Sequence, residues 1–328
     1  MNVGVSIPLP AYWVDPGAMA QKAEELGFES FWCAEHPVMP VKTTSRFPGS
    51  EDGVIPEAYA HFVDPFVALA RASGMTRRIK LATGIVLVPE RHPLLLAKEV
   101  STLDRFSGGR FLFGIGAGWL KEETEMFGGD FAHRWTQTRE SVLAMKELWT
   151  KPEAEFHGTY YDFPPVKSNP KPLQTPYPPV LLGGAAKNVL ERVVAWGDGW
   201  LPNHITPAEL REGRGRLDRL AKDAGRDPST LTISVYGQLP DRDLINRLLD
   251  AGATRVVVRP SAVKTDAEMA AQLTKIAEGL TAFFTTNQKQ IVSFVEGLIS
   301  GAQELGSAVA SLAPIGKSSY KLRHTGIQ

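Results

Sequence analysis

The sequence predicts a single (β/α)8 barrel, in which eight parallel strands form a closed barrel inside a ring of helices. The chain has 328 residues, which leaves room for insertion loops beyond the roughly 250 residues typical of this fold. Short apolar runs alternate with amphipathic runs along the chain, as they do in successive βα units. Eight such units follow one another without a break, and this favours a closed barrel over an open sheet.

The first half of the chain contains four predicted units. Asp15 suits a helix N-cap, Pro16 suits the first helical position, and Gly27 marks the helix end. The Pro- and Gly-rich stretch at 37–62 is too long to be a simple connection. The predicted strands are 3–8, 28–34, 79–88 and 110–115, and the predicted helices are 16–26, 64–73, 93–106 and 134–149.

The second half continues the alternation after an insertion at 151–179, which is rich in prolines and aromatics and predicted to be irregular. The predicted strands are 180–182, 199–201, 231–236 and 255–258, and the predicted helices are 187–196, 207–224, 241–251 and 266–280. We therefore assign residues 1–284 to the barrel. Residues 285–328 repeat apolar side chains at spacings of four and three, which predicts an extra C-terminal helical segment that packs on the barrel or on a second subunit.

Composition excludes several classes of protein. Lys plus Arg and Asp plus Glu number 36 each, so no basic excess indicates a nucleic-acid partner. No apolar run approaches the roughly 18 residues of a membrane span, and the N-terminus lacks the features of a signal peptide; we expect a cytoplasmic protein. The single cysteine, Cys33, rules out an intrachain disulfide. No zinc, P-loop or G-x-S-x-G motif is present, and we expect no metal site.

Chemistry in this fold is expected at the C-terminal ends of the strands. The second strand is followed by Glu35 and His36, and a histidine beside a carboxylate can exchange protons near neutral pH. The same pair could simply cap the strand and hold the long loop. The third strand contains Thr83 and Gly84, where a glycine indicates either a plain bulge or a surface against which a flat ring packs.

Glycines also mark the ends of the next two strands. Alternate glycines at 114–118 remove side chains, so that the backbone can lie close to a planar cofactor, although their spacing is not the dinucleotide-binding fingerprint. Gly183 and Gly184 directly precede a predicted helix, whose N-terminal N–H groups favour a phosphate over a plain tight turn. Asn203 and His204 follow the sixth strand and are expected to line the same site.

The block Leu-Asp-Arg-Phe-Ser-Gly-Gly-Arg at 103–110 is the most specific motif. Together with 81–89, 97–102 and 114–119, and with later motifs in the expected order, it resembles the luciferase-like monooxygenase superfamily over about residues 1–280. This resemblance implies a barrel that binds reduced FMN or coenzyme F420, a 5-deazaflavin, at the strand C-termini. It also implies a small-molecule substrate and a homodimer.

The resemblance assigns roles to individual residues. The Gly84–Ile85 bond falls where the family often has a non-prolyl cis peptide, which forms a bulge behind the flavin ring next to Thr83. His36 falls at the position of an active-site histidine in F420-dependent members, and we expect Glu35 to assist it. The remaining cofactor-binding residues implied are Gly116, Ala117 and Gly118 for the ring and ribityl chain, Gly183, Gly184 and Ala185 for the phosphate, and Asn203 and His204 beside them.

The long loop favours the F420-dependent branch, because its Phe47-Pro48, Asp52-Gly53 and Pro56 resemble probable F420-dependent oxidoreductases of actinobacteria. Trp119 stands where sugar-phosphate dehydrogenases of the family have a glutamate that acts as an acid. We therefore expect Trp119, Trp13 and the loop to form an apolar substrate pocket. The expected reaction is hydride transfer between F420 and a small organic substrate. The alternatives are an FMN-dependent monooxygenase and a barrel that binds a flavin without catalysis.

Overall fold

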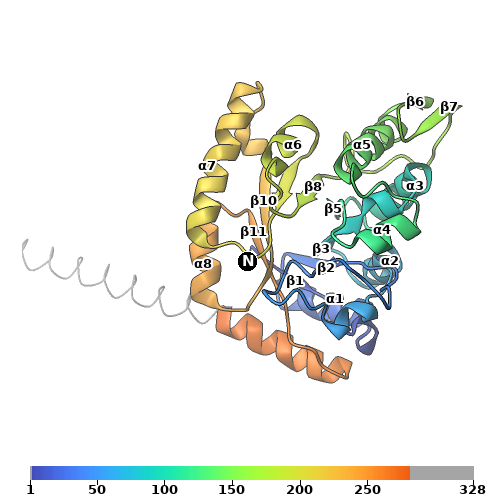
Figure 1. Cartoon of the computed structure of the whole chain (residues 1–328). Helices are drawn as coiled ribbons and strands as arrows, with labels where there is room; N and C mark the ends of the chain where they lie inside the picture. The colour runs from blue at the N-terminus through green and yellow to red at the C-terminus, as the bar shows by residue number, and fades with distance from the viewer. Residues whose placement is uncertain (1, 281–328) are drawn as a thin grey trace, which may run out of the picture. The chain divides into compact units, whose positions relative to one another are not determined.

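The computed structural model of the chain describes residues 2–280 (Figure 1). Two compact units divide the chain, residues Met1–Glu278 and Gly279–Gln328. The predicted C-terminal helical segment, 285–328, lies outside the described residues. Within residues 2–280, no helix combines the length and the apolar character that crossing a membrane requires.

The strands form a closed parallel barrel, as the sequence predicts. Their order is β3-β2-β1-β11-β10-β9-β8-β5-β4, and a further pairing of β3 with β5 closes the ring. β3 and β4 together take one position in the barrel, since both pair with β5. The strands are β1 (Val3–Ser6), β2 (Ser30–Cys33), β3 (Lys80–Thr83), β4 (Val86–Leu87), β5 (Phe111–Gly116), β8 (Val180–Gly183), β9 (Gly199–Leu201), β10 (Thr232–Gln238) and β11 (Arg255–Val258).

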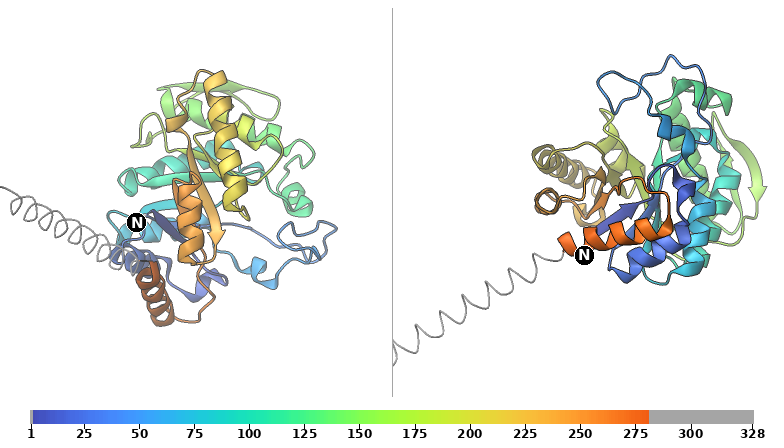
Figure 2. Two further views of the ribbon diagram at one scale, coloured as in Figure 1. Left: turned by 90° about the vertical axis from the view of Figure 1, so that its left-hand side faces the viewer. Right: turned by 90° about the horizontal axis from the view of Figure 1, so that it is seen from below.

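Helices surround these strands, and the long loop at 37–62 extends away from the barrel in both views of Figure 2. Asp15 and Asp64 act as N-caps, each accepting backbone N–H bonds in the first turn of its helix. The helices are α1 (Pro16–Glu25), α2 (Pro65–Met75), α3 (Pro93–Phe106), α4 (Lys121–Met126), α5 (Arg134–Thr150), α6 (Val189–Trp196), α7 (Pro207–Asp223) and α8 (Arg242–Asp250), and residues 266–280 are also helical. Short 3-10 helices are η1 (Ala11–Trp13), η2 (Glu57–His61), η3 (Val88–Glu90) and η4 (Pro228–Thr230).

The interior of the barrel is filled by side chains rather than open, as is usual for this fold. One layer takes a residue from each of six strands, and Ile85 and Tyr236 pack against it. The side chains of Ile85 and Tyr236 are only partly buried, so they lie at the edge of the packed layer. The members of the layer are Trp32, Ala82, Leu112, Leu181, Leu201 and Val257.

Two sequence predictions were wrong in detail, and one helix was not predicted. The third strand is not continuous over 79–88, because the cis peptide bond Gly84–Ile85 separates β3 from β4 and a 3-10 turn follows. The insertion at 151–179 is not wholly irregular, since β6 (Ala154–His157) and β7 (Asp162–Val166) form an antiparallel hairpin. Helix α4 was not predicted, because its sequence Lys-Glu-Glu-Thr-Glu-Met lacks the apolar periodicity of a longer helix.

We predict that Gly114→Ala destabilises the barrel while Gly74→Ala does not. A Cβ at Gly114 would lie 1.9 Å from the backbone oxygen of Thr83, and overpacking of this kind costs roughly 1–3 kcal/mol. A Cβ at Gly74, inside α2, would meet nothing within 4 Å, so alanine there should stabilise the helix by about 0.5–1 kcal/mol. Urea unfolding measures both; equal midpoints for the two variants would contradict the close strand contact.

Candidate active site

The structure brings the predicted site residues to one end of the barrel, because each of them lies at or just after the C-terminal end of a strand. Trp13 follows β1, His36 follows β2 and Ile85 follows β3. The others lie at the ends of β2, β3, β5, β8 and β9. They are Glu35, Thr83, Gly84, Gly116, Ala117, Gly118, Trp119, Gly183, Gly184, Ala185, Asn203 and His204.

The peptide bond Gly84–Ile85 is cis, as the resemblance implied. The hydroxyl of the buried Thr83 donates to the carbonyl of Gly114 over 2.7 Å, which ties β3 to β5 immediately before the bulge. A Cβ on Gly116 would lie 2.7 Å from the Ile85 side chain, and a Cβ on Gly183 would lie 2.8 Å from it. These two glycines therefore make room for Ile85, a role that the sequence analysis did not assign to them.

His36 is held by two hydrogen bonds. Its Nδ1 lies 2.6 Å from Oε2 of Glu123, and the indole N–H of Trp119 donates to its Nε2 over 3.3 Å. Because an indole nitrogen can only donate, Nε2 must accept, and the ring proton then resides on Nδ1 and points to the carboxylate. The arrangement is a neutral imidazole with a basic Nε2, backed by a carboxylate.

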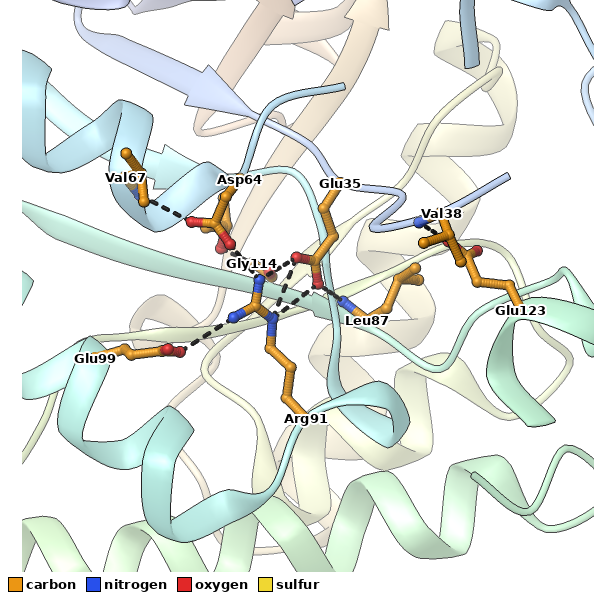
Figure 3. Close-up of polar contacts among 10 residues, drawn as sticks. Glu35, Val38, Asp64, Val67, Leu87, Arg91, Glu99, Gly114 and Glu123 are labelled. Carbon is orange, nitrogen blue, oxygen red and sulfur yellow. Dashed lines mark hydrogen bonds and ion pairs between the residues drawn. The ribbon is translucent and has the colours of Figure 1, made fainter. Parts of the chain in front are cut away.

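Glu35 has a different partner from the one expected. Its carboxylate accepts a 2.7 Å bond from Arg91 and a 2.6 Å bond from the backbone N–H of Leu87 (Figure 3). The carboxylate bonded to His36 belongs instead to Glu123, in the unpredicted helix α4. Burial raises the pKa of Glu35, and the charge of Arg91 opposes that shift.

Arg91 also bonds two further carboxylates, Asp64 at 2.7 Å and Glu99 at 3.2 Å, and Figure 3 shows it between all three acids. We call Arg91, Glu35, Asp64 and Glu99 the Arg91 network. The side chain of Arg91 is 18% exposed, and that of Glu35 is 2% exposed. The network joins the end of β2 to the starts of α2 and α3, and so fixes the residue next to His36.

The loop at 37–62 brings aromatic side chains against His36. The ring centroids of Tyr59, Phe62 and Trp119 lie 5.5, 5.4 and 5.6 Å from that of His36. Phe47 contacts both Tyr59 and Trp119, at 4.9 and 5.5 Å. We call Phe47, Tyr59, Phe62 and Trp119 the aromatic cluster; it leaves the His36 side chain only 6% exposed. Trp13, at 40% exposure, has no ring contact with this cluster among the described residues.

The turn between β8 and α6 leads into the helix that carries Arg192, and the charge of Arg134 acts on that residue. Gly184 has a φ of 91°, and a Cβ there would meet nothing within 4 Å. Arg192, in the first turns of α6, stacks on Trp135 and has a buried Nη1 with no hydrogen-bond partner in the described part of the chain. Arg134 donates to the carbonyl of Gly118 over 3.0 Å. Burial lowers the pKa of Arg192, Glu191 opposes this shift, and the charge of Arg134 adds to it.

Other predicted residues are placed without a partner that defines a role. Ala185, Asn203 and His204 are exposed. The backbone of Asn203 forms a bridge with Tyr236, and His204 has a left-handed φ of 47°. Within residues 2–280, no group of three or more His, Cys, Asp or Glu is arranged to hold a metal ion.

Sequence reasoning missed three residues of the site: Glu123 and Glu90, both buried acids, and Arg259, which follows β11. Glu123 is fully buried. It belongs to a short, strongly acidic helix, however, and from the sequence alone it resembles an ordinary surface residue. Arg259 is exposed, and its positive charge opposes the burial that raises the pKa of Tyr59. Only its position after the last strand could have indicated it.

A sequence model described as luciferase-like monooxygenase matches residues 9–240. The chain belongs to this family. An uncharacterized protein of Mycobacterium tuberculosis is 36% identical over 264 residues, which cover 78% of this chain and 91% of the relative. An FMNH2-dependent dimethylsulfone monooxygenase of Pseudomonas putida is 35% identical over 175 residues, 51% of this chain and 46% of that protein.

Among solved structures, the coenzyme F420-dependent tetrahydromethanopterin reductase of Methanopyrus kandleri is similar, with a TM-score of 0.64 and 19% identity. The match covers 87% of this chain and 100% of the reductase. At this identity the likeness concerns the fold. The family thus contains oxidoreductases and monooxygenases. A flavin-type cofactor is consistent with both the FMNH2-dependent and the F420-dependent relative.

We predict that Arg91→Met strongly destabilises the protein, because it leaves the buried carboxylate of Glu35 without its cation. Removing one partner of a buried ion pair costs roughly 3–5 kcal/mol. Arg71→Met provides the control: Arg71 also pairs with an aspartate, Asp15, but it is largely exposed, so its loss should change little. Denaturant unfolding compares the two; an Arg91 variant as stable as the Arg71 variant would contradict the role of the network.

Proposed function

We propose that this protein is an oxidoreductase that transfers a hydride between coenzyme F420 and a small organic substrate, with His36 exchanging the accompanying proton. The observation that carries the proposal is the 2.6 Å contact of His36 Nδ1 with Glu123, which leaves the basic Nε2 directed to the aromatic cluster. When bound, the deazaflavin would supply the hydride acceptor or donor. The chain itself must bind and orient the cofactor and the substrate, and it must exchange the proton.

The proton step follows from the hydrogen bonds of His36. As a substrate hydroxyl becomes a carbonyl, Nε2 accepts the hydroxyl proton and the hydride leaves from the same carbon. Glu123 stabilises the imidazolium that results, because its carboxylate already accepts the Nδ1 proton. In the reverse direction Nε2 returns the proton to the carbonyl oxygen. The substrate oxygen must replace the indole N–H of Trp119 at Nε2.

The residues around Gly184 fit an anionic group such as the phosphate that F420 and FMN share. The open space at Gly184 and the unpartnered Nη1 of Arg192 support this assignment, and exposed N–H groups before α6 would add hydrogen bonds. Arg134 would hold the same anion from the side of Gly118. Ile85 would contact the ring, since Gly116 and Gly183 leave space for it at the bulge.

The second candidate function is an FMN-dependent monooxygenase, which the relative from Pseudomonas putida favours at 35% identity. Reduced FMN reacts with dioxygen, whereas a deazaflavin does not do so usefully. His36 and the phosphate-binding residues would serve either reaction, so these side chains do not separate the two. F420 remains our proposal because of the resemblance in the long loop, which also supplies three members of the aromatic cluster.

We predict that the purified protein binds F420 more tightly than FMN. Titration of each cofactor, followed by its fluorescence, measures the two dissociation constants. Arg192→Met should weaken the binding of both cofactors alike, because the anion is common to them, while Arg219→Met, on the exposed surface of α7, should change neither. Tighter binding of FMN, together with substrate-dependent oxygen uptake, would favour the monooxygenase instead.

We also predict that His36→Ala retains cofactor binding but loses turnover by roughly 10²–10⁴-fold, the usual contribution of an acid–base residue. Glu123→Gln should lose turnover too, because an amide stabilises an imidazolium less well than a carboxylate does. Steady-state rates and cofactor titrations of the same preparations separate the two effects. Unchanged turnover in His36→Ala would remove this residue from the mechanism.

A further inference from the structure

Glu90 is a buried acid that the proposed mechanism does not use. It ends the 3-10 helix η3 and is 8% exposed. Its Oε1 accepts a 3.1 Å hydrogen bond from the hydroxyl of Thr124, and its Oε2 is buried with no hydrogen-bond partner among residues 2–280. A charged carboxylate would leave one oxygen unsatisfied here, and that costs far more than leaving a neutral carboxyl in the same place.

The charges around Glu90 also oppose its ionisation. Burial raises its pKa to about 8, and the neighbouring carboxylates Glu123 and Glu35 add to the shift. Arg91 is the cation that opposes it, but among the described residues that guanidinium forms its ion pairs with Glu35 and two other acids. Burial, the two neighbouring acids and the unpartnered Oε2 therefore all favour the protonated carboxyl.

Thr124 connects Glu90 to the catalytic histidine. It follows Glu123 in the chain, and both lie in α4, a helix that begins without a side-chain cap. Thr124 is fully buried, and its hydroxyl is the group that donates to Glu90. The position of Glu123 against His36 thus depends on a turn that is anchored to η3 through the bond between Thr124 and Glu90.

We propose that Glu90 is a positioning residue that works as a neutral carboxyl: it anchors Thr124, so that Glu123 presents its carboxylate to His36. Ionisation of Glu90 would place a second negative charge beside Glu123 in a buried space, where like charges repel strongly. The site would therefore lose its arrangement at alkaline pH. This consequence for turnover rests on the proposed function, while the charge state of Glu90 does not.

The charge state is tested by stability against pH, without cofactor. A carboxyl with its pKa raised from 4.5 to about 8 holds a proton that the unfolded chain releases, so its contribution to stability falls as pH rises between these values. Glu90→Gln cannot release a proton. Its melting temperature should therefore rise relative to that of the wild type from pH 5 to pH 8, and Glu125→Gln, an exposed acid of the same helix, should show no such trend. A constant difference for Glu90→Gln would overturn the proposal.

The positioning role is tested by NMR of ¹⁵N-labelled histidine, with the His36 signals assigned by their loss in His36→Gln. Glu90→Gln should keep the ring-nitrogen shifts of the Nδ1–H tautomer, while Glu90→Ala and Thr124→Val should change them. Turnover should fall at least tenfold in Glu90→Ala and be largely restored in Glu90→Gln, with its alkaline limit moved to higher pH. If Glu90→Gln perturbs His36 as much as Glu90→Ala does, the charged form is the one required and the proposal is wrong. If no turnover is found in any variant, the NMR and melting results still decide whether the proposal for Glu90 is correct.

Discussion

The ion pair between Arg91 and Glu35 is the interaction on which the rest of the site depends. Glu35 precedes His36 directly and accepts the backbone N–H of Leu87 just beyond the bulge. Arg91 reaches Asp64, the N-cap of α2, with the same guanidinium. Strand β2, the bulge and two helices are therefore linked through the one, partly buried, guanidinium of Arg91. Such a pair adds little net stability over apolar packing, but it strictly limits how these elements can be arranged.

The bulge at Ile85 shows how much of a site can be predicted from sequence. The glycines at 116 and 183 were recognised as places where side chains are missing, and the cis bond at Gly84–Ile85 followed from the resemblance. The sequence could not indicate which side chain fills the space that these two glycines leave. The space is filled by Ile85, which lies in the break between β3 and β4, and such a contact depends on the relative positions of segments that are distant in the chain, which a pattern along one strand does not contain.

The eight βα units could be predicted because each has its own apolar period, caps and stop signals. The acids that surround His36 could not, because they depend on tertiary packing. Glu35 precedes His36 in sequence and was the natural partner to choose, yet the bond is formed by Glu123, 87 positions away. Helix α4 is short and acidic, and its glutamates differ in burial without any difference in local sequence that marks them. Burial of this kind is visible only once the barrel is closed.

The loop at 37–62 begins one residue after His36 and ends two residues before Asp64, so the Arg91 network lies close to both of its ends. Inside the loop, however, the backbone N–H of Val38 donates to Glu123, and the hydroxyls of Thr44 and Ser45 donate to Glu122, so the loop is also tied to α4. A change inside the loop therefore acts on two things at once: the aromatic side chains that cover His36 and the helix that carries its partner Glu123. Under the proposed function, the segment that would select the substrate would also help to hold the acid that backs His36, so that specificity and proton transfer would vary together.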